Sequence, residues 1–163
     1  MKILPTLLLL VSTHFFAQKT IPKVLEKLNS ESVPYITVKE LQKKEGVILL
    51  DSRERKEFNV SHIKDAINVG YNQFDNNEII DKFANKNAII VVYCSIGVRS
   101  ERIGEKLLKM GYKNVYNLYG GIFEWKNNNG KVVNNKDIET DDVHTYNKKW
   151  SQYLKNGRKV YGN

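Results

Sequence analysis

The chain of 163 residues is 41% hydrophobic and 27% charged, a composition that is ordinary for one globular domain with a hydrophobic core. No long low-complexity segment and no internal repeat is present, which argues against disordered and repeat architectures. The formal net charge is +8, but lysines and arginines are scattered, and the sequence has no zinc-finger or RNA-recognition signature. We therefore expect a basic surface and no nucleic-acid partner.

Residues 1–17 have the pattern of a secretory signal peptide. Lys2 precedes a short apolar block at residues 7–11, and Ala17 is a small residue at the expected cleavage site. The block is shorter than the about 20 residues that a membrane-spanning helix needs. We therefore predict cleavage after Ala17, export to the periplasm or the medium, and no stable membrane anchor. An uncleaved amphipathic N-terminus is the alternative.

Residues 18–34 predict a short helix and a linker ahead of the main domain. Thr20 can cap a helix over residues 20–29, and Pro22 suits its first turn. Residues 30–34 would then form the linker.

Strands and helices alternate through the main domain, which we assign to residues 35–127. Apolar runs predict strands at residues 35–36, 47–50, 66–69, 88–93 and 114–118. Capping residues and helical periodicity predict helices over residues 37–44, 75–83, 100–110 and 121–127, and a short helix that follows Arg55 and ends at Phe58. This order predicts an α/β fold of three layers, with a mainly parallel sheet of about five strands and helices on both faces.

Residues 128–163 form a C-terminal extension. The Asn- and Gly-rich residues 126–135 predict a loop or hairpin. Thr140 would then begin a last helix that Gly157 ends, with one face formed by Val143, Tyr146, Trp150 and Leu154. We expect this helix to pack on the domain, with His144 on its surface and Trp125 and Trp150 in the core; the helix could instead offer a surface to a protein partner.

The only cysteine, Cys94, lies at the carboxyl end of an apolar predicted strand, and a short loop separates it from the amino terminus of the next helix. Backbone N–H groups and the helix dipole at such a place favour negative charge and lower the pKa of a thiol. The sequence therefore predicts that Cys94 is a nucleophile in an anion-binding loop, although it could be an inert buried residue. With one cysteine, no intramolecular disulfide or dithiol chemistry is possible.

The spacing from Cys94 to Arg99 restricts the chemistry of this loop. The pattern is Cys-x4-Arg-Ser, one residue shorter than the Cys-x5-Arg of tyrosine phosphatases. A shorter ring of N–H groups encloses a smaller space, which fits a terminal sulfur on the cysteine better than a phosphate. Gly97 stands where the curl needs a positive φ or a close backbone approach.

Three other polar residues are better explained by structure than by catalysis. Asp51 ends a predicted strand, where it would support the rim of the sheet by pairing with Arg53. His62 lies in a predicted turn and would make a structural hydrogen bond. No two histidines have the spacing of metal ligands, so we expect no metal and no cofactor.

Residues 35–127 resemble a single-domain rhodanese, a sulfurtransferase module. The resemblance rests on segments in the family's order: residues 49–54 with Glu57 and Phe58, residues 61–68, residues 94–100 and residues 119–125. The second segment carries Ser61 where the family has glycine. The third, Cys94-Ser95-Ile96-Gly97-Val98-Arg99-Ser100, matches the active loop.

The resemblance implies that Cys94 takes a sulfur atom from a donor such as thiosulfate and passes the persulfide sulfur to cyanide or a thiol. It implies that Arg99 binds the anionic end of the donor. The persulfide would be held by backbone N–H groups of Ser95, Ile96, Gly97, Val98 and Ser100. The alternatives are a non-catalytic sulfur carrier or interaction module and, on the same fold, a cysteine phosphatase or arsenate reductase, against which the loop length argues.

Overall fold

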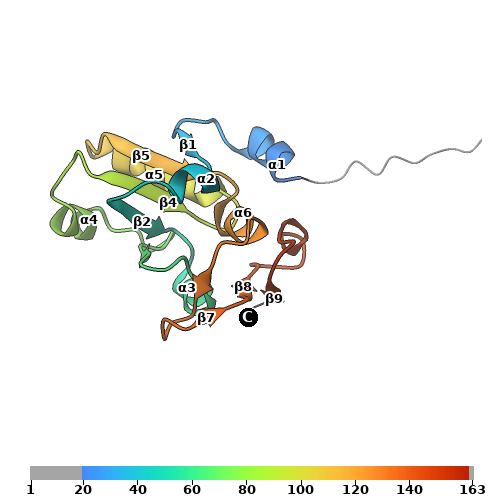
Figure 1. Ribbon diagram of the computed structural model, residues 1–163. Coiled ribbons are helices and arrows are strands. Elements are labelled where there is room, and N and C mark those ends of the chain that lie inside the picture. Colours follow the sequence, from blue (N-terminus) through green and yellow to red (C-terminus); the bar gives the residue numbers. More distant parts are fainter. Residues whose placement is uncertain (1–19, 162–163) are drawn as a thin grey trace, which may run out of the picture.

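The computed structural model describes residues 20–161, and its centre is a five-stranded parallel sheet (Figure 1). The strand order is β1-β5-β4-β2-β3, and the parallel sheet of five strands confirms the predicted α/β fold. The strands are β1 (Tyr35–Ile36), β2 (Val47–Asp51), β3 (Ile67–Asn68), β4 (Ile89–Tyr93) and β5 (Asn114–Leu118). The predicted signal peptide, residues 1–17, lies outside the described residues.

Strand β4 lies in the middle of the sheet and has apolar side chains on both faces. Val91 and Tyr93 join one hydrophobic cluster and Ile90 and Val92 the other, because successive side chains of a strand point to opposite faces. All four side chains are fully buried. A strand covered on both sides has no polar face, which explains the continuous apolar run in the sequence.

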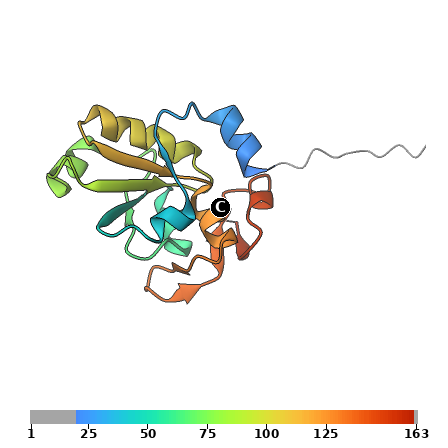
Figure 2. The ribbon, with the colours of Figure 1, turned by 45° about the horizontal axis from the view of Figure 1, so that its top comes forward.

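Helices cover both faces of the sheet, which makes three layers (Figure 2). Helices α4 (Asn76–Lys82) and α5 (Val98–Lys109) pack through Ile79, Ile103 and Leu107 on one face. The other face carries α1 (Ile21–Leu28), α2 (Val38–Leu41) and α6 (Gly121–Asn127), while α3 (Arg55–Val60) contacts the C-terminal extension. Among residues 20–161, no helix has the length and apolar character to cross a membrane.

Local capping signals place two helix starts where we predicted them. Thr37 and Glu40 form a capping box at the start of α2, and Asp75 caps α4 through the N–H of Asn77. The helix predicted over residues 100–110, α5, begins two residues earlier than expected, so Ser100 is not its cap. The helix begins at Val98 after Gly97, whose φ of 108° is left-handed, and the Ser100 hydroxyl donates to Asn117 Oδ1 at 2.7 Å. The Ser100 hydroxyl therefore bonds to Asn117, on the neighbouring strand, instead of capping the helix.

The last helix, predicted to begin at Thr140 and to end at Gly157, does not form. The segment holds β8 (Asp142–His144) and a 3-10 turn (Ser151–Tyr153), and β8 pairs in parallel with β9 (Arg158–Val160). The N–H of Thr145 donates to the carbonyl of Val160 at 2.9 Å, so its hydrogen bond goes to a partner fifteen residues away. Periodicity within one segment cannot detect such a partner.

The other predictions for the extension are met in part. Residues 126–135 lead into a short hairpin, in which β6 (Val132–Val133) pairs with β7 (Glu139–Thr140) in antiparallel fashion. Trp125 and Trp150 are partly buried and pack against the core. His144 was predicted to be on the surface, but it is buried because β8 lies against α3.

Candidate functional site

Cys94 lies at the carboxyl end of β4, with its sulfur at the floor of a cavity. The residue is 1% exposed, and its Sγ accepts a hydrogen bond from the N–H of Gly97 at 3.1 Å. The Ser100 hydroxyl is 3.5 Å from Sγ but 2.7 Å from Asn117 Oδ1. Because a hydroxyl has one hydrogen, it can serve only one of these acceptors at a time.

The surroundings of Cys94 favour the thiolate. Burial raises the pKa of the thiol, but the charge of Arg99 and hydrogen bonds from Ser100 and Gly97 lower it, and the balance leaves the pKa below its ordinary value. A thiolate is the nucleophilic form of cysteine. The electrostatics predicted from the position before a helix are therefore present, with Arg99 as the main cause of the lowering.

Hydrogen bonds to its backbone carbonyl groups hold the loop after Cys94 in its curled shape. The carbonyl of Gly97 accepts from Asn117 Nδ2 at 2.8 Å and from Asn29 Nδ2 at 3.0 Å. At the start of α6, the N–H of Ile122 donates to the carbonyl of Cys94 at 2.9 Å. A Cβ on Gly121 would lie 2.3 Å from that carbonyl oxygen, so only glycine permits the approach.

Arg99 is held by a fully buried carboxylate, Glu57. Its Nη1 and Nη2 donate to Oε2 and Oε1 of Glu57 at 2.6 and 2.8 Å, and Nη2 also lies 3.1 Å from Ser95 Oγ. Burial raises the pKa of Glu57, but the hydrogen bonds and charge of Arg99 bring it below its ordinary value, so the pair is ionised. The role of Arg99 in binding an anionic donor stays a prediction; the structure shows both ends of its guanidinium engaged by Glu57.

Replacing Arg99 by methionine is expected to raise the pKa of Cys94. The change removes the positive charge that contributes most to lowering this pKa. The rate of Cys94 alkylation by iodoacetamide, measured against pH, should therefore reach its midpoint at a higher pH than in the wild type. Arg102→Met is the matched control, because Arg102 lies on the same helix and is exposed. Equal midpoints in the two variants would contradict the role of Arg99.

Asp51 and Arg53 form the predicted ion pair below the rim. Both side chains are 0% exposed, and Arg53 Nη2 donates to Asp51 Oδ2 at 2.6 Å and to the carbonyl of Ser61 at 2.7 Å. His62 follows in this turn, with Nδ1 3.1 Å from the carbonyl oxygen of Phe58 and its ring stacked on the Phe58 ring. These residues support the rim and lie outside the lining of the cavity.

Several residues near the site were not predicted to belong to it, among them Glu57, Asn117, His144, Tyr146 and Trp150. Glu57 was noted only as part of a segment, because its partner Arg99 is 42 positions away. His144 Nδ1 lies 4.0 Å from Glu57 Oε1, and burial lowers the pKa of His144. The two aromatic residues were assigned to the C-terminal helix that does not form.

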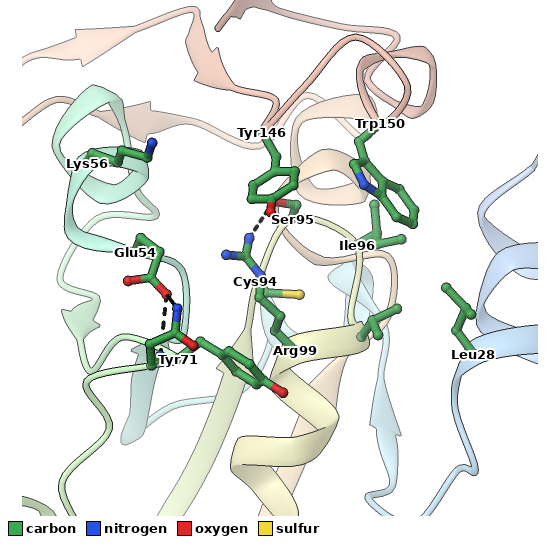
Figure 3. Close-up of a pocket in the computed structure, with 12 residues that line it drawn as sticks. Leu28, Glu54, Lys56, Tyr71, Cys94, Ser95, Ile96, Arg99, Tyr146 and Trp150 are labelled. Atoms are coloured by element: carbon green, nitrogen blue, oxygen red, sulfur yellow. Dashed lines mark hydrogen bonds between the residues drawn. The ribbon is translucent and has the colours of Figure 1, made fainter. Parts of the chain in front are cut away.

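A cavity of about 590 Å³ opens above Cys94 (Figure 3). Its lining includes the predicted loop residues Ser95, Ile96, Val98 and Arg99, whereas Gly97 and Ser100 lie behind the sulfur. Among residues 20–161, no group of three histidine, cysteine, aspartate or glutamate side chains could hold a metal ion. The geometry is that of a thiol with a lowered pKa, facing a cavity of the size of a small organic ligand.

Comparison with known proteins finds relatives that share this domain. A family model described as Rhodanese-like domain matches residues 36–128. Thiosulfate sulfurtransferase GlpE of Coxiella burnetii is 29% identical over 59% of this chain and 87% of its own length. Adenylyltransferase and sulfurtransferase UBA4 of Candida albicans is 31% identical over 68% of this chain but 26% of its own. A thiosulfate sulfurtransferase structure from Pseudomonas aeruginosa has the same fold, with a TM-score of 0.61 at 18% identity over 72% of this chain and 23% of the other.

Proposed function

Because the chain belongs to the rhodanese-like domain family, we propose that it is a sulfurtransferase that works through a persulfide on Cys94. The observation that carries the proposal is the thiol itself. Cys94 faces a cavity, has a lowered pKa, and accepts a backbone N–H from a loop of the length that suits one extra sulfur atom. Relatives named as sulfurtransferases support the same reading.

The reaction we propose has two steps. The Cys94 thiolate attacks the outer sulfur of a donor such as thiosulfate, and the S–S bond of the donor breaks with its electron pair leaving on sulfite. An acceptor, either cyanide or a thiolate, then attacks the outer persulfide sulfur, and the electron pair of the S–S bond returns to Cys94. No proton, metal or cofactor is needed to balance either step.

The loop contributes to these steps by electrostatics. N–H groups and a charged arginine that are already in place stabilise anionic sulfur without reorganising. Gly97 already donates to Sγ, and we expect the remaining N–H groups from Ser95 to Ser100 to face the outer sulfur once it is bound. Arg99, fixed by Glu57, lowers the pKa of Cys94 and so favours its thiolate form between turnovers.

Mass spectrometry of the intact protein tests the proposal. After incubation with thiosulfate, the protein should gain the mass of one sulfur atom and should lose it again when cyanide is added. A sulfur carrier without transferase activity would gain the mass but keep it in the presence of cyanide and small thiols. No added sulfur with any sulfane donor would contradict the proposed function.

A further inference from the structure

The C-terminal extension, which lies beyond the region matched by the family model, forms part of the wall around Cys94. Tyr146 and Trp150 both line the cavity, and both belong to the segment between β8 and β9. In the view of Figure 3, they lie on one side of the Cys94 sulfur and Tyr71 lies on the other. The family region alone would therefore leave this side of the cavity open.

Tyr146 is held at the cavity by an unusual backbone conformation. Its φ is 62°, in the left-handed region that bulky residues rarely adopt, and its N–H donates to His144 Nδ1 at 3.1 Å. The side chain is still 52% exposed, and its ring centre lies 5.6 Å from the Arg99 guanidinium carbon. A strained backbone that displays an exposed ring at a cavity points to a binding role.

Trp150 is positioned by its own turn. Its N–H is within hydrogen-bond distance of the Asn147 carbonyl and Oδ1, at 3.2 and 3.1 Å, and its ring lies 5.9 Å from that of Tyr153. The other apolar residues of the wall come from separate parts of the chain: Leu28, Tyr71, Ile96 and Val98. Tyr146 and Trp150 thus complete an enclosure that is largely apolar and aromatic around one reactive sulfur.

The charges at this cavity do not form a site for a dianion. Arg99 is neutralised by Glu57 at 2.6 Å, while Lys56 and Glu54 in the lining carry opposite charges. The formal charges of these four groups cancel. Thiosulfate carries two negative charges and has no apolar surface. It would therefore find no net positive charge to bind and would make no favourable contact with the aromatic rings.

We propose that the preferred sulfur donor is an organic sulfane compound with one negative charge and an aromatic group, of the kind represented by an aryl thiosulfonate. The inference rests on the proposed function. The aromatic group would lie against Tyr146 and Trp150, and the sulfane sulfur would face Cys94 Sγ. The thiolate attacks this sulfur, and the bond between the sulfane and sulfonyl sulfurs breaks with its electron pair leaving on the arenesulfinate. Charge is conserved, since one anion leaves as another enters.

Two donors with the same reacting group isolate the contribution of the ring. Benzenethiosulfonate and methanethiosulfonate both carry one negative charge, and only the first has a ring. With cyanide as the acceptor, kcat/KM from thiocyanate formation, corrected for each uncatalysed rate, should be about tenfold higher for the benzene compound, as expected for one buried ring. Thiosulfate should be the poorest of the three donors.

Variants of the wall test which residues create this preference. Trp150→Ala should remove most of the preference, and Tyr146→Asn should reduce it, with asparagine chosen because it tolerates a left-handed φ. Tyr161→Asn is the matched control, because Tyr161 is 53% exposed and lies outside the cavity lining. It should leave the ratio unchanged.

The outcomes separate the two proposals. If none of the three donors adds sulfur to Cys94, the proposed function fails. If all of them add sulfur but the ring gives no advantage, only the aromatic donor is overturned. The aromatic donor is also overturned if both Tyr146→Asn and Trp150→Ala fold and keep the full preference for the benzene compound. Tyr146→Asn should fold, because it removes a half-exposed side chain.

Discussion

Replacing Cys94 by serine is expected to abolish sulfur uptake and to lower the rate of sulfur transfer by at least about 10³-fold. The hydroxyl of serine stays protonated in surroundings that lower the pKa of a thiol, and the chain has no second cysteine to replace it. The measurement is thiocyanate formation from thiosulfate and cyanide, with the mass of the intact protein recorded in parallel.

Serine has nearly the shape of cysteine, so the variant should fold and the loss can be assigned to chemistry. Unchanged circular dichroism and thermal unfolding would confirm the fold. Ser61→Ala is a useful control, because it changes a buried residue that lies outside the cavity lining, and it should keep full activity. Transfer by Cys94→Ser at a rate near that of the wild type would contradict a persulfide on this residue.

Replacing Asp51 by asparagine is expected to lower the free energy of unfolding by about 3–5 kcal/mol, because it leaves a buried charge without its partner. Burial lowers the pKa of Arg53, but the charge and hydrogen bonds of Asp51 raise it by more, so the pKa stays above its ordinary value. The guanidinium is therefore charged although 0% of its side chain is exposed. Arg53 Nη1 already has no hydrogen-bond partner among the described residues. Asparagine keeps the shape of the site, so the loss reports on the charge.

The matched control is Asp142→Asn, which removes the same charge from the pair with Arg158. That arginine is 74% exposed, and an exposed pair contributes at most about 1 kcal/mol. Urea unfolding of both variants, followed by far-ultraviolet circular dichroism, gives the comparison. Equal losses in the two variants would contradict the importance of burial for the pair between Asp51 and Arg53.

In β4, α2 and α4, the sequence alone determined the local structure. The apolar run of β4, the capping box of Thr37 and the cap at Asp75 each depend on contacts within a few residues, so pattern and structure agree. The five strands followed from such runs. Alternating strands and helices leave a covered parallel sheet as the stable arrangement, because the apolar faces of both must be buried.

Only the tertiary structure decided which side chains surround Cys94. The partner of Arg99 is Glu57, on another helix, and the partner of Ser100 is Asn117, on the neighbouring strand. The aromatic wall depends on a segment whose flanking strands, β8 and β9, pair between residues sixteen positions apart. Between Thr140 and Gly157, burial and hydrogen bonds to distant segments outweigh the local preference for a helix. Apolar residues at helical spacing can therefore also be residues that line a cavity, as Tyr146 and Trp150 do.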